Sequence, residues 1–201
     1  MIKGIIFDIG GVLVEVKIKS FLEHFVRVTG FTKEQLYAMI MLGGEWDLFE
    51  KGMMTEKELK EKIERDHGIK PALMEKMADD WRSTLKPIPE TIDMVKKLKG
   101  RYKMFALSNV DRITTEQCFD RFDFYKHFNG VVFSWKVHMR KPEPAIYKYV
   151  LKQMKLKPEE VVFIDNYQPN LPEASKIGIH TILYRNPGQL KTELKKLGVD
   201  V

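Results

Sequence analysis

Short runs of consecutive apolar residues recur along the chain, and most are followed by stretches whose apolar residues recur at helical spacing. Such runs suit strands that are buried on both faces, as in a parallel sheet covered by helices. Strands that alternate with helices favour a doubly wound, Rossmann-like α/β fold with right-handed crossovers. The pattern predicts about five strands, at residues 5–7, 104–107, 131–133, 161–164 and 181–183.

The long stretch between the first two runs has a different character. Over roughly residues 15–86 the apolar residues recur only at helical spacing, and Thr55 and Glu58 are spaced as a capping box. The positions expected to face inward are Phe21, Leu22, Phe25, Val28, Leu36, Met39, Ile40, Trp46, Leu48, Phe49, Met74, Met77, Ala78, Trp81 and Leu85. We therefore predict an α/β core from residues 1–14 and 87–201, with a helical domain inserted at 15–86. Another helix is predicted over 112–126.

Polar residues directly follow three of the predicted strands. They are Asp8 after the first strand, Ser108-Asn109 after the second and Asp165-Asn166 after the fourth. In the common 3-2-1-4-5 order the first and fourth strands are neighbours, and open α/β sheets bind ligands at this switch point. Asp8 and Asp165 are therefore expected to face each other there, with Ser108 alongside.

These residue types suit phosphoryl transfer. Facing carboxylates repel each other unless a cation lies between them, and Mg²⁺ prefers one or two carboxylates together with phosphate oxygens. Ser108 and Asn109 add hydrogen-bond donors, Lys141 adds a positive charge, and Gly10 and Gly11 allow a turn that brings N–H groups close to an anion. An aspartate can also act as a covalent nucleophile. Each residue alone also fits a structural role, but their combination at the strand ends favours a site.

The composition of the chain limits the classes of molecule that it is expected to bind. The chain of 201 residues has 34 Lys and Arg against 28 Asp and Glu, a formal net charge of +6, but the basic residues are scattered and form no recognised nucleic-acid motif. We expect no nucleic-acid partner and a mildly positive field that attracts phosphorylated substrates. The single Cys118 excludes an internal disulfide and fits a reducing compartment. No apolar run could span a bilayer and the N-terminus begins with a strand, so we expect a cytoplasmic monomer or homodimer with no membrane partner.

Four segments carry the polar residues in a distinctive order. They are FDIGGVLV with Asp8, ALSN with Ser108, RKPEPAIY with Lys141 and VVFIDNYQPNLPEASKIGI with Asp165. In this order they resemble the four motifs of the haloacid dehalogenase-like hydrolase superfamily, and the resemblance covers the full chain. It implies a hydrolase with a Rossmann-like core.

The resemblance implies a role for each segment. Asp8 would be the nucleophile that forms an aspartyl phosphate, and Mg²⁺ would bind Asp8, Asp165 and the backbone carbonyl of Gly10. Asn166 and Asn170 would support the last loop. The substrate would be bound by Gly10, Gly11, Ser108, Asn109 and Lys141. The helical insertion would be a type 1 cap that closes over the site and excludes water, with residues 49–59 at its middle.

Two positions depart from the pattern that the resemblance implies. Phosphatases of the superfamily usually carry a second Asp as general acid and base where this chain has Gly10, and such catalysis is typically worth about 10²–10⁴-fold. A similar first motif occurs among sugar-phosphate phosphatases. Glu15 in the same loop, or Glu45 or Asp47 in the insertion, is a candidate replacement. Asn166 stands where many relatives have a second consecutive acid, so we expect weaker Mg²⁺ binding.

The leading hypothesis is a Mg²⁺-dependent phosphatase that acts on a small phosphorylated metabolite, with sugar phosphates as one class. A 2-haloacid dehalogenase is an alternative, because such enzymes also lack the second Asp. They need no metal, and their fourth motif typically lacks an acid where this chain has Asp165. A catalytically weak relative with a binding or regulatory role is the other alternative. The residues that select the substrate are expected near the break at residues 43–46.

Overall fold

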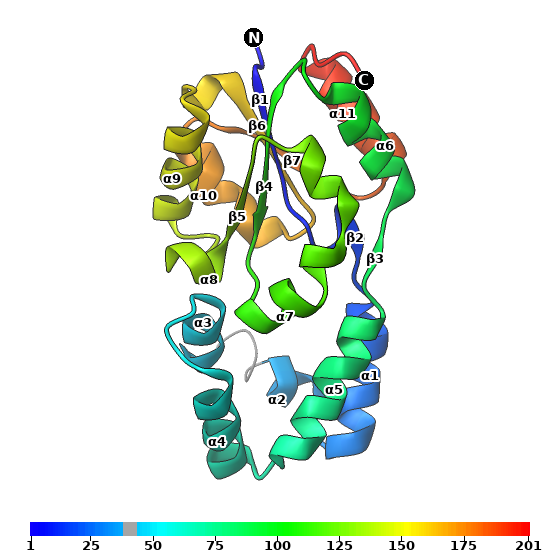
Figure 1. Ribbon diagram of the computed structural model, residues 1–201, viewed down its shortest axis with the longest axis vertical. Helices are drawn as coiled ribbons and strands as arrows, with labels where there is room; N and C mark the ends of the chain where they lie inside the picture. Colours follow the sequence, from blue (N-terminus) through cyan, green and yellow to red (C-terminus); the bar gives the residue numbers. More distant parts are fainter. Residues whose placement is uncertain (38–43) are drawn as a thin grey trace.

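The sheet has the predicted strands in the predicted order. A computed structural model describes residues 1–37 and 44–201. Five parallel strands lie in the order β5-β4-β1-β6-β7, which is the 3-2-1-4-5 arrangement in chain order (Figure 1). Their bounds are β1 Gly4–Phe7, β4 Lys103–Ser108, β5 Gly130–Phe133, β6 Val161–Asp165 and β7 His180–Leu183. The α/β fold class is confirmed.

Alternating side chains of the strands build a hydrophobic core on each face of the sheet. In β1, Ile5 and Phe7 belong to one buried cluster and Ile6 to the other. The first cluster is covered by α6 (Pro89–Leu98) and α11 (Pro187–Lys196), the second by α9 (Pro144–Met154) and α10 (Leu171–Lys176). Burial on both faces explains why the strands read as continuous apolar runs.

Strand register brings the two acidic strand ends to the same level. Phe7 pairs with Ile164 of β6 and with Ala106 of β4, so the next residues, Asp8 and Asp165, leave the sheet side by side. The Asp8 N–H donates to the Ile164 carbonyl at 2.8 Å and extends the ladder by one bond. The sheet therefore fixes the separation of the two carboxylates.

The predicted helix over 112–126 is wrong in its length. Helix α7 covers only Arg112–Gln117, and two short 3₁₀ turns follow, η2 (Phe119–Arg121) and η3 (Asp123–His127). Between α7 and η2, Cys118 leaves helical geometry, and its side chain is buried. The rings of Phe119, Phe122 and Phe124 pack in series into the sheet core, with centroids 6.1 and 5.5 Å apart. A continuous helix would not direct these three rings to one side.

A separate helical segment lies beyond the carboxyl ends of the strands (Figure 1). Its ends pair as a two-stranded antiparallel ribbon, β2 (Val14–Glu15) with β3 (Lys86–Pro87). Between them lie α1 (Ile18–Thr29), α2 (Lys33–Tyr37), α3 (Gly44–Glu50), α4 (Glu56–His67) and α5 (Pro71–Ser83). The segment has a hydrophobic cluster of its own, formed by Phe25, Leu59, Ile63, Ile69 and Met77.

Some local expectations for this segment hold and others do not. The capping box at Thr55 and Glu58 is confirmed, with both reciprocal bonds present. Val28 and Leu48, expected to face inward, are 43% and 38% exposed. The reason is that α1 and α3 each cover the neighbouring helices with a narrow apolar stripe. The expected positions Met39 and Ile40 and the start of the break at 43–46 lie outside the described residues.

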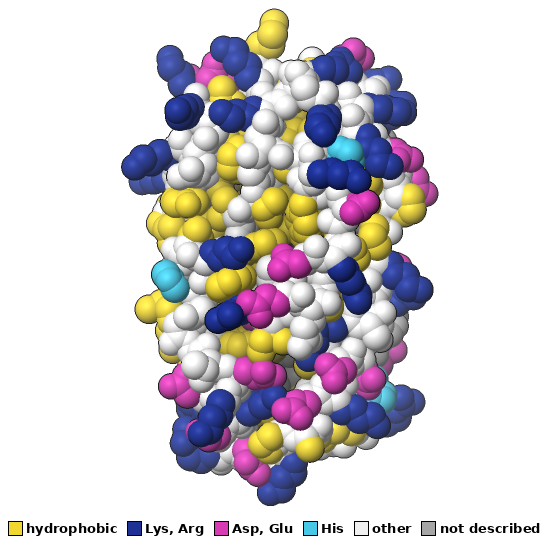
Figure 2. Space-filling view, viewed as in Figure 1, with side chains coloured by type: hydrophobic (Ala, Val, Ile, Leu, Met, Phe, Trp, Pro, Cys, Tyr) yellow, Lys and Arg dark blue, Asp and Glu magenta, His cyan; other side chains and the backbone are white. Residues whose placement is uncertain are grey.

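The remaining short elements complete the sheet edge and the surface. They are α8 (Ser134–Val137), η4 (Pro158–Glu160) and η5 (Gln168–Asn170). Basic and acidic side chains are spread over the face in Figure 2, the acidic ones more often on its lower half. Within the described ranges, 1–37 and 44–201, the helices are all too short or too polar to cross a membrane.

Candidate active site

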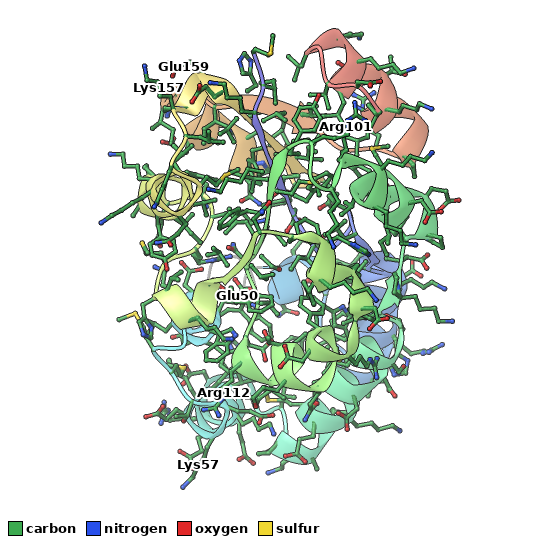
Figure 3. All side chains as sticks on the ribbon, turned by 45° about the horizontal axis from the view of Figure 1, so that its top comes forward. Glu50, Lys57, Arg101, Arg112, Lys157 and Glu159 are labelled. Atoms are coloured by element: carbon green, nitrogen blue, oxygen red, sulfur yellow. The ribbon has the colours of Figure 1, made fainter. Side chains whose placement is uncertain are left out.

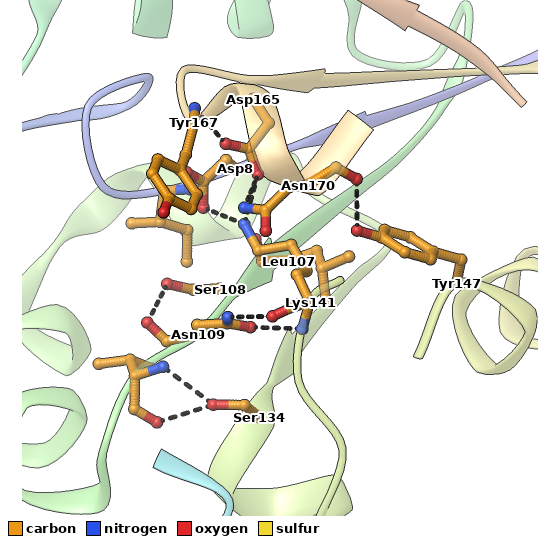
Figure 4. Close-up of polar contacts among 12 residues, drawn as sticks. Asp8, Leu107, Ser108, Asn109, Ser134, Lys141, Tyr147, Asp165, Tyr167 and Asn170 are labelled. Atoms are coloured by element: carbon orange, nitrogen blue, oxygen red, sulfur yellow. Dashed lines mark hydrogen bonds and ion pairs between the residues drawn. The ribbon is translucent and has the colours of Figure 1, made fainter. Parts of the chain in front are cut away.

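A buried lysine joins the two strand-end carboxylates. Lys141 Nζ donates to Asp8 Oδ1 and to Asp165 Oδ2, both at 2.7 Å, and to the Leu107 carbonyl at 3.3 Å (Figure 4). Asp8, Lys141 and Asp165 are 7%, 2% and 0% exposed. The structure thus brings together three of the predicted site residues at the carboxyl end of the sheet. Charged groups this deeply buried are retained when they are paired.

Asn109 fixes the backbone that carries the lysine. Its Oδ1 accepts from the Lys141 N–H and its Nδ2 donates to the Lys141 carbonyl, each at 2.8 Å. Ser108, one residue earlier at the end of β4, is 3% exposed, and its Oγ lies 3.4 Å from the Asn109 carbonyl. Asn109 therefore serves in this structure as a clamp for the loop that carries Lys141, while the Ser108 hydroxyl makes only a long contact.

The site carries excess negative charge. Burial and the neighbouring Asp165 raise the pKa of Asp8 to about 7, against the opposing pull of Lys141. Burial disfavours the Lys141 ammonium, but the charges of Asp165 and Asp8 outweigh it and raise the pKa of Lys141. One ammonium faces two carboxylates, so a further cation would stabilise the ionised cluster.

Asn166 packs into the turn after β1. With its amide nitrogen facing the turn, it donates to the Gly10 carbonyl at 2.8 Å and to Asp8 Oδ2 at 3.2 Å. Gly11 has φ +82°, and a Cβ there would lie 2.3 Å from the nearest atom of the Asn166 side-chain amide, so only glycine fits. The Gly11 N–H donates to the Val14 carbonyl at 2.7 Å, so in this structure it closes the turn and is not directed at a substrate anion.

The Asn170 side chain fixes the orientation of the Asp165 carboxylate. Its Nδ2 donates to Asp165 Oδ2 at 2.9 Å, and its backbone carbonyl accepts from the buried Tyr147 hydroxyl at 2.7 Å. The other oxygen of Asp165 accepts from the Tyr167 N–H at 2.7 Å. Asp165 is therefore held rigidly, with its charge pointing toward Asp8 and Lys141.

The oxygens at this edge suit a hard cation. Asp8, Asp165 and the Gly10 carbonyl supply only oxygen donors, and the excess negative charge favours a cation beside them. In the part of the chain that the structure describes, no three His, Cys, Asp or Glu side chains gather as a metal site. A cation here would thus use few protein ligands and complete its shell with water or phosphate, which is typical of Mg²⁺. In this structure the Asn166 amide donates to two of these oxygens, the Gly10 carbonyl and Asp8 Oδ2.

None of the three acids proposed from the sequence faces this cluster as a free carboxyl. Glu15 is an exposed residue of the β2–β3 ribbon. Glu45 pairs with Lys62 at 3.1 Å, and its pKa is lowered by backbone and Lys62 hydrogen bonds. Asp47 forms an ion pair with Arg140. Glu45 and Asp47 are therefore held in ion pairs with basic side chains, and Glu15 lies on the ribbon.

A different acid of the helical segment, Glu50 at the end of α3, lies at the boundary with the sheet. In Figure 3 it lies toward the middle of the molecule, whereas Lys57 points from the outer end of the segment. Its side chain is 17% exposed, and Arg140 Nη2 lies 2.9 Å from its Oε2. Burial and the charge of Asp111 raise the pKa of Glu50 to about 7. Apart from the likeness of residues 49–59 to the middle of a cap, no sequence signal indicates a functional role for Glu50.

Comparisons with known proteins agree with the fold. A family model described as haloacid dehalogenase-like hydrolase matches residues 2–178. Bifunctional epoxide hydrolase 2 of Rattus norvegicus is 46% identical over 72 residues, which are 36% of this chain and only 13% of that protein. D-ribitol-5-phosphate phosphatase of Bacteroides thetaiotaomicron is 21% identical over 96% of this chain and 97% of its own length.

A solved structure provides a further likeness. A HAD family enzyme from Bacteroides thetaiotaomicron, crystallised with magnesium and inorganic phosphate, is 26% identical and superposes with a TM-score of 0.74. The match covers 92% of this chain and 95% of that one. The similarity therefore extends over both the sheet and the helical segment.

Proposed function

The chain belongs to the haloacid dehalogenase-like hydrolase family, and we propose that within it the protein is a Mg²⁺-dependent phosphatase of a small phosphorylated metabolite. The observation that carries the proposal is the cluster of Asp8, Lys141 and Asp165. Two buried carboxylates share one ammonium, and the uncompensated charge lies beside an exclusively oxygen donor set. The phosphatase among the relatives and the neighbour that holds magnesium and phosphate support the same class.

In this mechanism Asp8 is the nucleophile. The Ile9 N–H and Lys141 both bind Asp8 Oδ1, at 2.8 and 2.7 Å, and so hold the carboxylate in one orientation. Asp8 attacks phosphorus, the bond from phosphorus to the leaving oxygen breaks, and the product is an aspartyl phosphate. Water then cleaves this intermediate and releases phosphate and free Asp8.

The surrounding residues bind charge and exclude water. Lys141 stabilises the negative charge on the transferring phosphoryl group, and Ser108 donates its hydroxyl to a phosphate oxygen. Mg²⁺, held by Asp8, Asp165 and the Gly10 carbonyl, would neutralise phosphate charge. Asn109 and Asn170 keep Lys141 and Asp165 in place through the bonds described above.

We further propose that the helical segment is a cap over the site, with residues 15–86 as the cap domain and 1–14 with 87–201 as the catalytic domain. Its α3 end contacts α8 and the loop after it. Lys51 pairs with Glu143, and His138 Nδ1 lies 2.8 Å from the Lys51 carbonyl. These contacts support a closed arrangement in which the segment covers the strand ends.

The proposal is tested by phosphate release from p-nitrophenyl phosphate and a panel of sugar phosphates, with and without Mg²⁺. We expect turnover that requires Mg²⁺ and falls to background in Asp8→Asn. Glu61→Gln, which changes an exposed acid on the far part of the cap, should turn over like the wild type. Mg²⁺-independent chloride release from 2-chloropropionate would instead support a dehalogenase. No turnover of either substrate by Mg²⁺-loaded protein would contradict a catalytic function.

A further inference from the structure

Gly10 leaves the proposed reaction without its usual proton carrier, and the structure contains an unassigned carboxyl that can supply one. In-line displacement puts the leaving oxygen on the side of phosphorus opposite to the nucleophile. Asp8 stands at the carboxyl end of β1, which faces the helical segment (Figure 1). The leaving group therefore points toward the helical segment, and an acid of that segment can reach it.

Glu50 contacts residues next to the loops that carry the proposed site residues. The Ser134 hydroxyl donates to the Glu50 carbonyl at 2.6 Å and accepts from the Val110 N–H at 2.9 Å. Val110 lies two residues after Ser108, in the loop that leaves β4 toward Asp111. Arg140, which contacts the Glu50 carboxylate, directly precedes Lys141. Glu50 thus contacts or adjoins both loops that carry site residues.

The charges around Glu50 suit a group that gains and loses a proton. Its Oε2 is buried and, among the described residues, accepts no hydrogen bond of good geometry. Arg140 contacts it but also pairs with Asp47, so one guanidinium serves two acids. Burial and Asp111, with a smaller effect of Asp8, favour the protonated form, while Trp46 and Lys141 favour the ionised one. The net result is a carboxyl poised near neutral pH, which is optimal for acid–base catalysis.

We propose that Glu50 is the general acid and base of this enzyme, in place of the aspartate that Gly10 lacks. The inference rests on the proposed phosphatase function. In the first half-reaction Asp8 attacks phosphorus, the bond to the leaving oxygen breaks, and Glu50 gives its proton to that oxygen, releasing an alcohol. In the second, ionised Glu50 takes a proton from water, the hydroxide oxygen bonds to phosphorus, and the bond between phosphorus and Asp8 breaks. Phosphate leaves and Glu50 is again protonated.

The test uses p-nitrophenyl phosphate, whose leaving group needs no proton. In Glu50→Gln the aspartyl phosphate should form at a near-normal rate, whereas its hydrolysis should slow by about 10²–10⁴-fold. Rapid mixing should show a burst of about one p-nitrophenolate per active site followed by slow turnover, with phosphorylated protein trapped by acid. Glu61→Gln is the matched control and should show wild-type kinetics without accumulation.

Two further variants separate proton transfer from a structural role. Gly10 has a backbone that accepts a side chain, since an added Cβ would meet only Val16 Cγ2, at 3.4 Å. Gly10→Asp should therefore restore turnover to Glu50→Gln. Asp111→Asn keeps the side-chain oxygen that accepts from the Thr114 N–H at the start of α7, but removes the negative charge that raises the pKa of Glu50. The rising limb of the pH–rate profile should therefore move to lower pH.

Several results would overturn the inference while leaving the phosphatase proposal intact. They are wild-type turnover by Glu50→Gln, an equal loss of burst and steady-state rates, or no rescue by Gly10→Asp. A pH–rate profile of Asp111→Asn that equals that of the wild type would also overturn the inference, and this result does not depend on whether Glu50→Gln folds correctly. Absence of Mg²⁺-dependent turnover in the wild type would instead contradict the proposed function itself, and this inference with it.

Discussion

Asn166 contacts the oxygens that we propose as ligands of Mg²⁺. Its amide nitrogen bonds the Gly10 carbonyl and Asp8 Oδ2, two of the three oxygens assigned to Mg²⁺. On the proposed function, Mg²⁺ would therefore compete with the Asn166 N–H donor for these oxygens. An amide at this position also contributes no negative charge to the metal shell, which lowers the affinity for a divalent cation.

Asn166→Asp should strengthen Mg²⁺ binding. The new carboxylate adds negative charge beside Asp8 and Asp165 and removes the competing N–H donor, so the Mg²⁺ concentration for half-maximal turnover should fall about tenfold, the size of typical effects around metal ligands. Titration of activity with Mg²⁺ measures it. Asn129→Asp adds the same charge at the opposite edge of the sheet, where the side chain only accepts from the Met104 N–H, and should change nothing. An unchanged or higher Mg²⁺ requirement in Asn166→Asp would contradict the assignment.

Some site residues could be predicted from the sequence because their position follows from the chain alone. Asp8 and Asp165 each end an apolar run, and parallel strands bring such ends together. Glu50 could not be predicted in this way, because its environment comes from Ser134 and Arg140, which are distant in sequence and are brought to it only by the docking of α3. A glutamate before Lys-Gly on a helix has no sequence signal of burial.

Ser134 of helix α8 links the helical segment to the sheet unit through its hydroxyl. Ser134 is fully buried, accepts from the Val110 N–H and donates to the Glu50 carbonyl. Ser134→Ala would leave the Val110 N–H without its acceptor, and an unsatisfied buried donor costs about 1–3 kcal/mol. We expect the free energy of unfolding in urea to fall by that amount.

The control for Ser134→Ala is Ser175→Ala, an exposed position on α10 that should change stability by less than about 0.5 kcal/mol. Turnover of p-nitrophenyl phosphate should also fall in Ser134→Ala, because Glu50 loses the bond that fixes its backbone. Equal stability of the two variants would show that this contact does not hold α3 to α8.

Helices and strands could be predicted where the apolar residues of a segment follow a single spacing, helical or extended. The central strands β1, β4 and β6 are buried on both faces, so their apolar runs are long, and the edge strands β5 and β7 keep shorter apolar runs that were also assigned correctly. The segment after α7 was misassigned because its aromatic residues recur at mixed spacings. Packing of the Phe119 and Phe124 rings against the sheet decides its backbone, and that contact is absent from any local pattern.

Removal of Mg²⁺ should be visible in the stability of the entire protein. Because folded protein binds the ion and unfolded chain does not, Mg²⁺ at a hundred times its dissociation constant should add about 2.7 kcal/mol to the free energy of unfolding. Thermal unfolding with saturating Mg²⁺ and with a chelator measures the difference. Asp165→Asn should abolish it. The same unfolding temperature in both conditions for the wild type would argue against a metal site at Asp8 and Asp165.

The β2–β3 ribbon has a consequence for how this architecture diversifies. Val14 pairs with Pro87, so the helical segment leaves and re-enters the sheet unit at neighbouring points. Its removal would leave two chain ends that a short turn could join, without changing the register of any strand. The segment is thus a replaceable cassette. Exchange of the segment would keep the strand register and the cluster of Asp8, Lys141 and Asp165 but would remove Glu50, so on our proposal a new segment would have to supply its own proton carrier.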